Sequence, residues 1–518
     1  MINLHCDFSS QCFFLCVKIL FINFMKKIFV LAALACLAFT SCEDIKPNGE
    51  ETLGDITDNP MLGDSPTTPL SPNQQKSKLI SVGEKLMAEC PSNEFQKLAD
   101  LAEDFFEAYV MSDYDYSAVE DWAEVELEKI YSETDSERLN GNVLTSEYYA
   151  KLVILLSNHS GNFVFGNTGV TVAAYNGTKA EFTLNGKKYV AVIEQKGKVT
   201  NAIFKHTEKG QYDSYGYEDE NGNWQYSDDP ITNKYSETID ITVGVPETIN
   251  VSITENGAQL ADVTVKFKAS FTPSGINLTT DNFSTEITAR INGYEIVINN
   301  VKYDGATGKA TYSETLKKDG TALVTSVISG DVKIDMVKET YRDGNSYDED
   351  IVIEAQIAQN ITAAIDILGE IQIIGACSNA LDASTSLDLF WDALYSNGNT
   401  PDEKTAQRHL DNFNTKFDFG IFYDKGNNRQ ADVEFDYISE KESAGYDRNG
   451  DGVINDLDNY YDFELFPIIV FNDGSRYAVE EYFTENSFGD FIEHVENFAD
   501  GYCHVFGYFY DLATNEDY

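Results

Sequence analysis

Residues 239–271, IDITVGVPETINVSITENGAQLADVTVKFKASF, decide the fold class. Most of their apolar residues occupy odd positions, before and after the dipeptide Asn256-Gly257, and the even positions carry mainly Thr, Asn, Asp, Ser and Lys. A period of two residues is typical of a β-strand with one buried face and one solvated face. Asn-Gly favours the type I′ turn of a two-residue hairpin. The segment therefore predicts two antiparallel strands joined by a tight turn.

The same turn signal recurs before and after this segment. Asn185-Gly186, Asn292-Gly293 and Asp319-Gly320 each lie between alternating runs of apolar and polar residues. A series of such hairpins predicts an antiparallel β-meander. We expect this meander to form a domain over residues 161–345.

One stretch, residues 207–235, interrupts the alternation with tyrosines and acidic residues. Its aromatic residues are Tyr212, Tyr215, Tyr217, Trp224 and Tyr226. We interpret the stretch as a solvated insertion, because loops tolerate insertions better than strands do. Exposed aromatic rings on such a loop could instead stack on sugar rings, and this alternative stays open.

Helical periodicity flanks the meander. Residues 75–160 are expected to be helical, with helices at 95–111, from Ser117 in a capping box with Glu120, and at 146–156. Residues 346–518 are expected to form an α+β domain. Its strands are predicted within 351–373, 417–423, 431–437, 462–471 and 476–479. Its helices are predicted at 384–396, at 401–414 with Thr400 as N-cap, and from Phe488, where Phe488, Phe491, Ile492, Val495 and Phe498 face inward. The class is therefore α+β, with helices packed on one face of the sheet.

The N-terminus carries an export signal. Reading from Met25, residues 26–27 are two lysines, residues 28–39 are apolar, and the following residues end in Cys42. Residues 39–42 resemble the lipobox of bacterial lipoproteins, which implies cleavage before Cys42 and lipid attachment to its thiol. A plain secretory signal is the alternative. We interpret residues 1–24 as an upstream extension and residues 25–42 as the signal peptide.

Residues 43–74 follow as a tether. Glu43 and Asp44 resemble the export signal of Bacteroidota-type surface lipoproteins, which implies an outer-membrane protein that faces the cell exterior. The rest of the segment is rich in Pro, Gly, Ser, Thr and Asp, as disordered linkers are. A flexible chain of this length spans roughly 30 Å, enough to hold a folded body clear of the membrane surface.

The charge of the chain excludes some partners. With 37 basic and 86 acidic residues, the formal net charge is −49. Nucleic acid and anionic lipid headgroups are poor partners for such a surface. Beyond Cys42 only Cys90, Cys377 and Cys503 remain, so at most one disulfide can form.

One motif points to specific chemistry. Residues 447–458, DRNGDGVINDLD, resemble the calcium loop of EF-hand and dockerin proteins across twelve positions. The resemblance implies Ca²⁺ ligands at Asp447, Asn449, Asp451, Val453 through its carbonyl, Asn455 and Asp458. Such a loop gathers the oxygen atoms that Ca²⁺ requires. Because the motif follows a predicted strand, we expect a single hairpin loop that binds a structural Ca²⁺. A turn without metal is the alternative.

No catalytic residue can be nominated. The sequence contains no P-loop, G-x-G-x-x-G, H-E-x-x-H, G-x-S-x-G or C-x-x-C motif. The leading hypothesis is a non-catalytic surface lipoprotein that binds a glycan or a protein. The second is a carrier of lipid or another small apolar ligand, in which the sheet curves around a helix. The third is a hydrolase of extracellular polysaccharide, which would need two carboxylates beside exposed aromatic residues.

Overall fold

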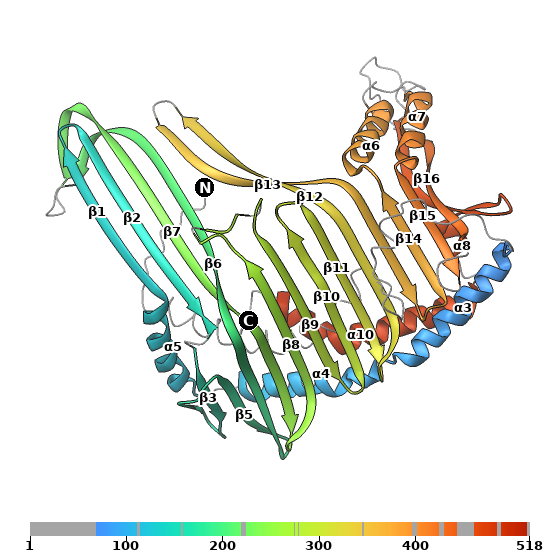
Figure 1. Cartoon of the computed structure of the whole chain (residues 1–518), viewed down its shortest axis with the longest axis horizontal. Helices are drawn as coiled ribbons and strands as arrows, with labels where there is room; N and C mark the ends of the chain where they lie inside the picture. The colour runs from blue at the N-terminus through green and yellow to red at the C-terminus, as the bar shows by residue number, and fades with distance from the viewer. Residues whose placement is uncertain are drawn as a thin grey trace.

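The computed structural model describes residues 69–110, 114–156, 159–218, 224–273, 275–277, 279–343, 346–395, 401–423, 429–442, 460–483 and 488–514. Helices precede and follow one large sheet, which confirms the expected α+β class (Figure 1). The strands predicted before and after residue 345 all belong to this sheet.

The helices and strands have the following bounds. The helices are α3 (Pro72–Glu89), α4 (Asn93–Phe105) with a π-helical turn at Phe106–Val110, α5 (Ser117–Ile130), α6 (Ala380–Tyr395), α7 (Glu403–Asn414), α8 (Val479–Tyr482) and α10 (Asp490–Thr514). The first strands are β1 (Tyr131–Asn140), β2 (Val143–Leu155), β3 (Gly161–Phe165), β4 (Val170–Ala173), β5 (Thr178–Leu184), β6 (Lys187–Glu218), β7 (Trp224–Glu255), β8 (Ala258–Ser270) and β9 (Asn282–Ile291). The others are β10 (Tyr294–Asp304), β11 (Lys309–Lys318), β12 (Thr321–Asp343), β13 (Ser346–Ile367), β14 (Ile371–Cys377), β15 (Phe417–Tyr423), β16 (Arg429–Glu442), β17 (Tyr460–Phe471) and β18 (Arg476–Ala478).

The four predicted hairpin turns are confirmed. Each dipeptide joins consecutive antiparallel strands: β5 to β6, β7 to β8, β9 to β10 and β11 to β12. In every turn both residues have positive φ, for example 50° at Asn256 and 83° at Gly257. Two consecutive positive φ values define the type I′ turn, whose twist matches that of the strands.

Strand pairing follows the chain from β5 to β18, with two additions. β2 pairs in parallel with β7, and β3 pairs in parallel with β5. The long hairpin of β12 and β13 also reaches back across the sheet, where residues 347–349 of β13 pair with residues 209–211 of β6. Pairing from β6 through β13 therefore returns to its starting strand, and the sheet curves strongly.

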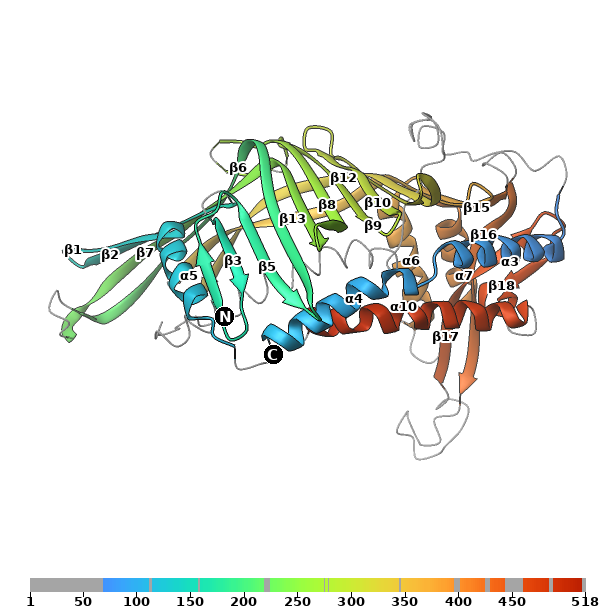
Figure 2. The same cartoon turned by 90° about the horizontal axis from the view of Figure 1, so that it is seen from below.

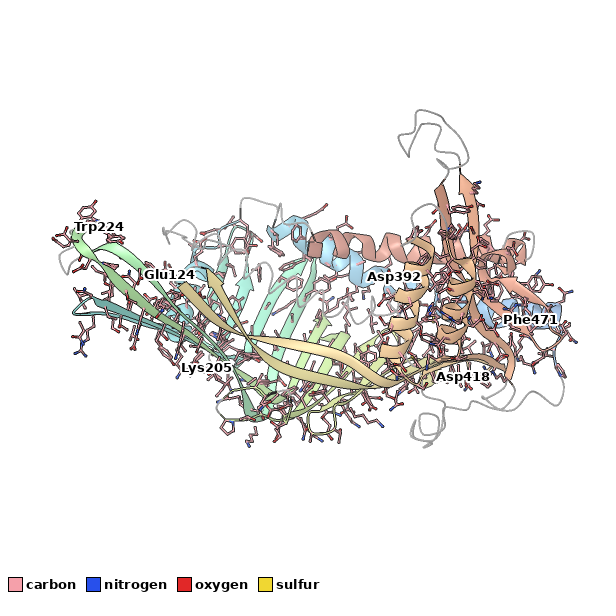
Figure 3. The ribbon with its side chains drawn as sticks, turned by 90° about the horizontal axis from the view of Figure 1, so that it is seen from above. Glu124, Lys205, Trp224, Asp392, Asp418 and Phe471 are labelled. Atoms are coloured by element: carbon pink, nitrogen blue, oxygen red, sulfur yellow. The ribbon has the colours of Figure 1, made fainter. Side chains whose placement is uncertain are left out.

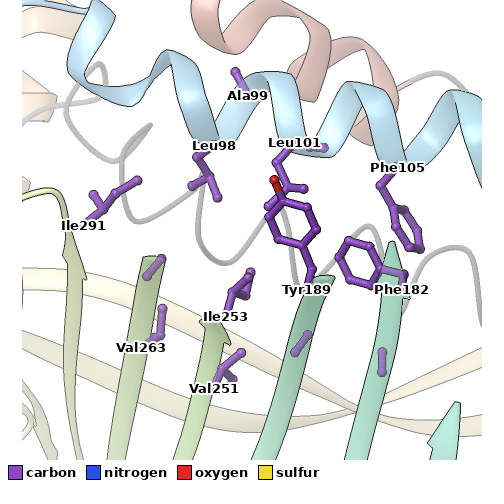
Figure 4. Close-up of a cluster of buried hydrophobic side chains, with 14 of the residues drawn as sticks. Leu98, Ala99, Leu101, Phe105, Phe182, Tyr189, Val251, Ile253, Val263 and Ile291 are labelled. Carbon is purple, nitrogen blue, oxygen red and sulfur yellow. The ribbon is translucent and has the colours of Figure 1, made fainter. Parts of the chain in front are cut away.

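The main core lies where α4 crosses the ends of the strands. Leu98, Leu101 and Phe105 of α4 point toward the sheet, as Figure 4 shows. They meet strand residues that are at least 91% buried, among them Phe182, Tyr189, Ile193, Val251, Ile253, Val263 and Ile291. Side chains of α4 thus cover the odd-numbered apolar residues of the sequence pattern at this end of β7 and β8.

α10 runs alongside α3 and α4 (Figures 1 and 2). The hydroxyl of Tyr502 donates to the carbonyl of Cys90 at 2.8 Å, and its ring lies 5.9 Å from that of Phe95. The inward position predicted for Val495 is wrong, because its side chain is 40% exposed. α4 and α10, which lie near the two ends of the described chain, therefore pack at the same ends of the strands.

Two predicted elements are wrong. Residues 146–156 do not form a helix, because β2 covers most of them and pairs with β1 on one side and β7 on the other. Residues 207–235 are not a loop insertion: residues 207–218 extend β6 and residues 224–235 begin β7. β2 has a distant partner in β7, whereas residues 207–235 pair mainly with each other as a hairpin that their polar composition did not indicate.

The helix starts also differ from the prediction. At α5 the side chain of Asp115 accepts from the amide of Ser117, and the expected capping box is not formed. The N-cap of α7 is Asp402, whose carboxylate accepts from the Thr405 amide, rather than Thr400. A capping box does form at Ser71, so α3 begins inside the range expected to be a tether.

Candidate functional site

The residues nominated from sequence motifs lie outside the described part of the chain. This holds for Cys42 and for the six calcium ligands Asp447, Asn449, Asp451, Val453, Asn455 and Asp458. Both nominations therefore stay predictions.

The structure does describe the two strands that flank the calcium motif. β16 and β17 are antiparallel, and their last pair is Glu442 with Tyr460. The motif thus lies in the connection between two strands that are held in register. Exposed carboxylates of Glu440 and Asp462 stand opposite each other near this end of the hairpin. A motif between paired strands agrees with the expected single hairpin loop.

A long projection of the sheet presents a second candidate site. We call it the arm: β1, β2, residues 199–218 of β6 and residues 224–245 of β7. β6 and β7 each contain 32 residues, so each is about 100 Å long when extended. The arm extends beyond α5 and away from the other helices (Figure 1). Trp224 lies at its tip (Figure 3).

Four exposed aromatic side chains lie along the two longest strands of the arm. Phe204 and Tyr212 occupy even positions of β6 within one continuous ladder, so they point to the same side, and the register shifts between Ser214 and Gly216. Tyr226 stands opposite Gly216 on β7, and Trp224 lies on the same side two residues away. We call Phe204, Tyr212, Trp224 and Tyr226 the aromatic face. Their exposed fractions are 49%, 50%, 57% and 85%.

The ring of Trp224 is placed by a glycine. A Cβ atom at Gly216 would lie 2.7 Å from three atoms of the indole, so a larger residue there would displace the ring. Trp224 and Tyr226 also contact each other edge to face, with ring centroids 6.3 Å apart. From Phe204 to Gly216 the strand covers about 40 Å, which is long enough for several sugar units.

The tip of the arm is acidic. Asp213, Asp228 and Asp229 are exposed beside the aromatic residues. The carboxylate of Asp213 accepts from the hydroxyl of Thr232 at 2.8 Å. These charges disfavour an anionic ligand at the aromatic face.

A contact between a histidine and a buried glutamate lies near the base of the arm. Nδ1 of His159 is 3.0 Å from Oε2 of Glu126, whose other oxygen pairs with Lys129. Glu126 belongs to α5, which leads directly into β1, and His159 lies just after β2. Nε2 of His159 is buried and has no hydrogen-bond partner in the described structure. The contact links the two ends of the β1–β2 hairpin.

A depression of about 400 Å³ lies beside α5. Its walls include Trp122, Asp121 and three small residues, Ala118, Ala173 and Ala174. The indole Nε1 of Trp122 donates to the carbonyl of Ser160 at 3.3 Å. An aromatic wall with one carboxylate could hold a single sugar unit.

A second depression, of about 460 Å³, lies where β15 and β16 separate. Asp418, Asp432 and Glu434 line it together with Phe417 and Phe419. A polysaccharide hydrolase would require such carboxylates beside aromatic rings. Here Asp418 and Asp432 both pair with the guanidinium of Arg429, at 2.6 and 2.5 Å. These two carboxylates of the depression are therefore engaged in ion pairs with Arg429.

The described residues contain no cluster of three or more His, Cys, Asp or Glu that could hold a metal ion. Cys90 and Cys377 are buried free thiols. No helix in the described part of the chain is long and apolar enough to cross a membrane. Comparisons of the chain with protein-family models, with curated proteins and with solved structures find no match.

Proposed function

We propose that this chain is a non-catalytic binding module, anchored by lipid at Cys42 on the outer membrane, that holds an extended neutral glycan on its arm. The observation that carries the proposal is the aromatic face, whose four rings are about half exposed or more and lie along a projecting strand pair. Aromatic rings offer sugar units a large contact area with little loss of side-chain entropy.

The shape and charge of the arm favour a glycan over other ligands. A protein partner would require a broad buried core of apolar contacts, whereas the aromatic face is narrow. An acidic polysaccharide would meet the exposed carboxylates of Asp213, Asp228 and Asp229. A neutral polymer can follow the row of rings without this repulsion.

The proposal is tested by electrophoresis of the purified chain through native gels that contain dissolved polysaccharides. We expect at least one neutral polysaccharide to slow its migration, and acidic polysaccharides to leave it unchanged. Retardation by acidic polymers alone, or no retardation across a broad neutral panel, would refute glycan binding on the arm.

Lipid attachment is tested by mass spectrometry of the protein isolated from its native membrane. We expect the mature chain to begin at Cys42 and to carry a diacylglycerol, because the residues before it form a lipobox-like site. The change Cys42→Ser should remove the lipid and release the chain from the membrane. An unmodified Cys42 in the native protein, or cleavage at another residue, would contradict the anchor.

We further propose that residues 447–458 bind a structural Ca²⁺. Extracellular loops of this kind bind at roughly 10⁻⁴–10⁻³ M, so millimolar calcium would fill the site. The melting temperature should therefore fall when a chelator is added, and Asp447→Ala should melt at the lower temperature with or without calcium. Asn427→Ala, in another connection between strands, provides the control. Identical melting of the wild type with and without chelator would rule the site out.

A further inference from the structure

A row of aliphatic side chains crosses the concave side of the sheet, next to the core under α4. Its members stand directly opposite one another on neighbouring strands and therefore share a face. In order across the sheet they are Ile249, Val265, Ile287, Ile298, Glu314, Ser326, Ile365, Ile373 and Ile421. We call these nine residues the aliphatic row.

The row runs along the border of the packed core: Ile249, Val265, Ile287 and Ile298 are partly buried against the core under α4, and Ile421 is buried in a neighbouring cluster. On β10 and β11 it lies two residues beyond Ile296 and Leu316, which belong to the core under α4. Several members are only partly buried, and Ile373 is 38% exposed. Apolar surface is therefore still available along the row after the core has been filled.

Two polar residues interrupt the row at its centre. Glu314 and Ser326 face each other on β11 and β12, and their exposed fractions are only 6% and 1%. The hydroxyl of Tyr312 donates to Oε2 of Glu314 at 3.0 Å. Oγ of Ser326 is buried without a hydrogen-bond partner in the described structure. Burial raises the pKa of Glu314, which favours its neutral form.

Such an arrangement is unfavourable for a sheet that has only to pack. A buried hydroxyl without a partner lowers stability, and a buried carboxyl costs more than an aliphatic residue of similar size. The seven aliphatic neighbours supply no hydrogen bonds from their side chains. A ligand with an apolar body and a hydroxyl group would complete the site.

We propose that the aliphatic row binds an elongated neutral amphiphile, whose hydrocarbon chain lies along the isoleucines and whose hydroxyl group pairs with Ser326 and Glu314. The four aliphatic residues from β7 to β10 span about 15 Å, because neighbouring strands are ~4.8 Å apart. A monoacylglycerol or a long-chain alcohol has the required chemistry. This site lies apart from the aromatic face and does not depend on the proposed glycan binding.

The charge of the ligand follows from the surroundings of the row. A fatty-acid carboxylate would approach a chain of net charge −49 and then face the carboxyl of Glu314. A cationic amine would require Glu314 to ionise in a site where burial favours its neutral form. A neutral hydroxyl can both donate and accept without either cost.

The proposal is tested by displacement of the neutral fluorescent probe N-phenyl-1-naphthylamine from the full chain. We expect monooleoylglycerol to displace the probe at a concentration at least tenfold lower than oleate or oleylamine. The variant Ser326→Ala should weaken monooleoylglycerol about tenfold, since one hydrogen bond is lost. Ser439→Ala, an exposed serine on β16, is the matched control and should behave as wild type.

The melting temperature of the ligand-free variant separates ligand binding from a structural role. If the hydroxyl of Ser326 has a partner only when the ligand is bound, Ser326→Ala removes an unpaired polar atom from the ligand-free protein. The variant should then melt at the same or a higher temperature than the wild type. A lower melting temperature would mean that a buried water or another group of the protein already pairs with the hydroxyl of Ser326. That result would overturn the proposal. Stronger displacement by oleate or oleylamine, or no displacement by monooleoylglycerol, would overturn it as well.

Discussion

The double variant Trp224→Ala/Tyr226→Ala is expected to bind the neutral polysaccharide at least 30-fold more weakly than the wild type. The two rings lie at the tip of the arm with exposed fractions of 57% and 85%, so they offer much of the free surface of the aromatic face. Central aromatic residues of a binding surface commonly contribute about 2 kcal/mol or more, which corresponds to roughly 30-fold in affinity. Affinity electrophoresis at several polysaccharide concentrations measures the change.

Tyr215→Ala provides the matched control for the double variant. Tyr215 is 64% exposed and lies on β6, but it occupies the register irregularity between Ser214 and Gly216 and is not a member of the aromatic face. We expect its affinity to stay within about twofold of the wild type. An equal loss in the control and the double variant would show that the aromatic face has no specific role.

Phe105→Ala should lower the free energy of unfolding by about 3–5 kcal/mol, the usual cost of deleting a buried phenylalanine ring. Phe105 is 2% exposed. Its ring contacts those of Phe182 and Phe165, with centroids 4.8 and 5.3 Å away. Removing it opens a cavity between α4 and the sheet. Urea denaturation followed by circular dichroism measures the effect.

The comparison for this change is Phe204→Ala. The same atoms are deleted, but Phe204 is 49% exposed, so the cost should stay below about 1 kcal/mol. If both variants lost equal stability, the packing of α4 on the sheet would not be the main source of stability.

The strands and turns of the meander could be predicted because their signals are local. Asn256-Gly257 needs only its own backbone preference to form the turn, and the alternation around it fixes which side is buried. The capping box at Ser71 has the same local character, although the neighbouring prolines suggested a tether instead. The conformational preferences of neighbouring residues determine these elements, and such preferences can be predicted from the sequence.

The arm could not be predicted as a whole, because a long-range pairing joins its two hairpins. β2 is held by β7, about ninety positions later in the chain, and no periodicity within residues 143–155 announces this partner. Local sequence patterns do not predict the pairing of β13 with β6 either. Residues 207–235, rich in tyrosine and acidic residues, resemble a loop until their pairing as strands is known.

The candidate sites also divide into those that a local motif identifies and those that only the pairing of strands reveals. Cys42 and Asp447 could be nominated because a short motif carries each of them, and both await the tests above. Trp224 and Tyr226 were visible as aromatic residues, but only the strand pairing places them with Gly216 at the tip of the arm. Glu314 and Ser326 were missed. The acidic residue within the strand Lys309–Lys318 was the available signal, and it acquires meaning only once its cross-strand neighbours are known.

The position of α10 has a consequence for biogenesis. Tyr502 of α10 contacts both Cys90 and Phe95, at the other end of the described chain. A polypeptide is synthesised from its N-terminal end, so the strand ends that α10 helps to cover stay incompletely packed until this last helix is made. During that interval apolar strand ends are open to solvent and prone to aggregate. A chaperone that shields these ends would raise the yield of folded protein.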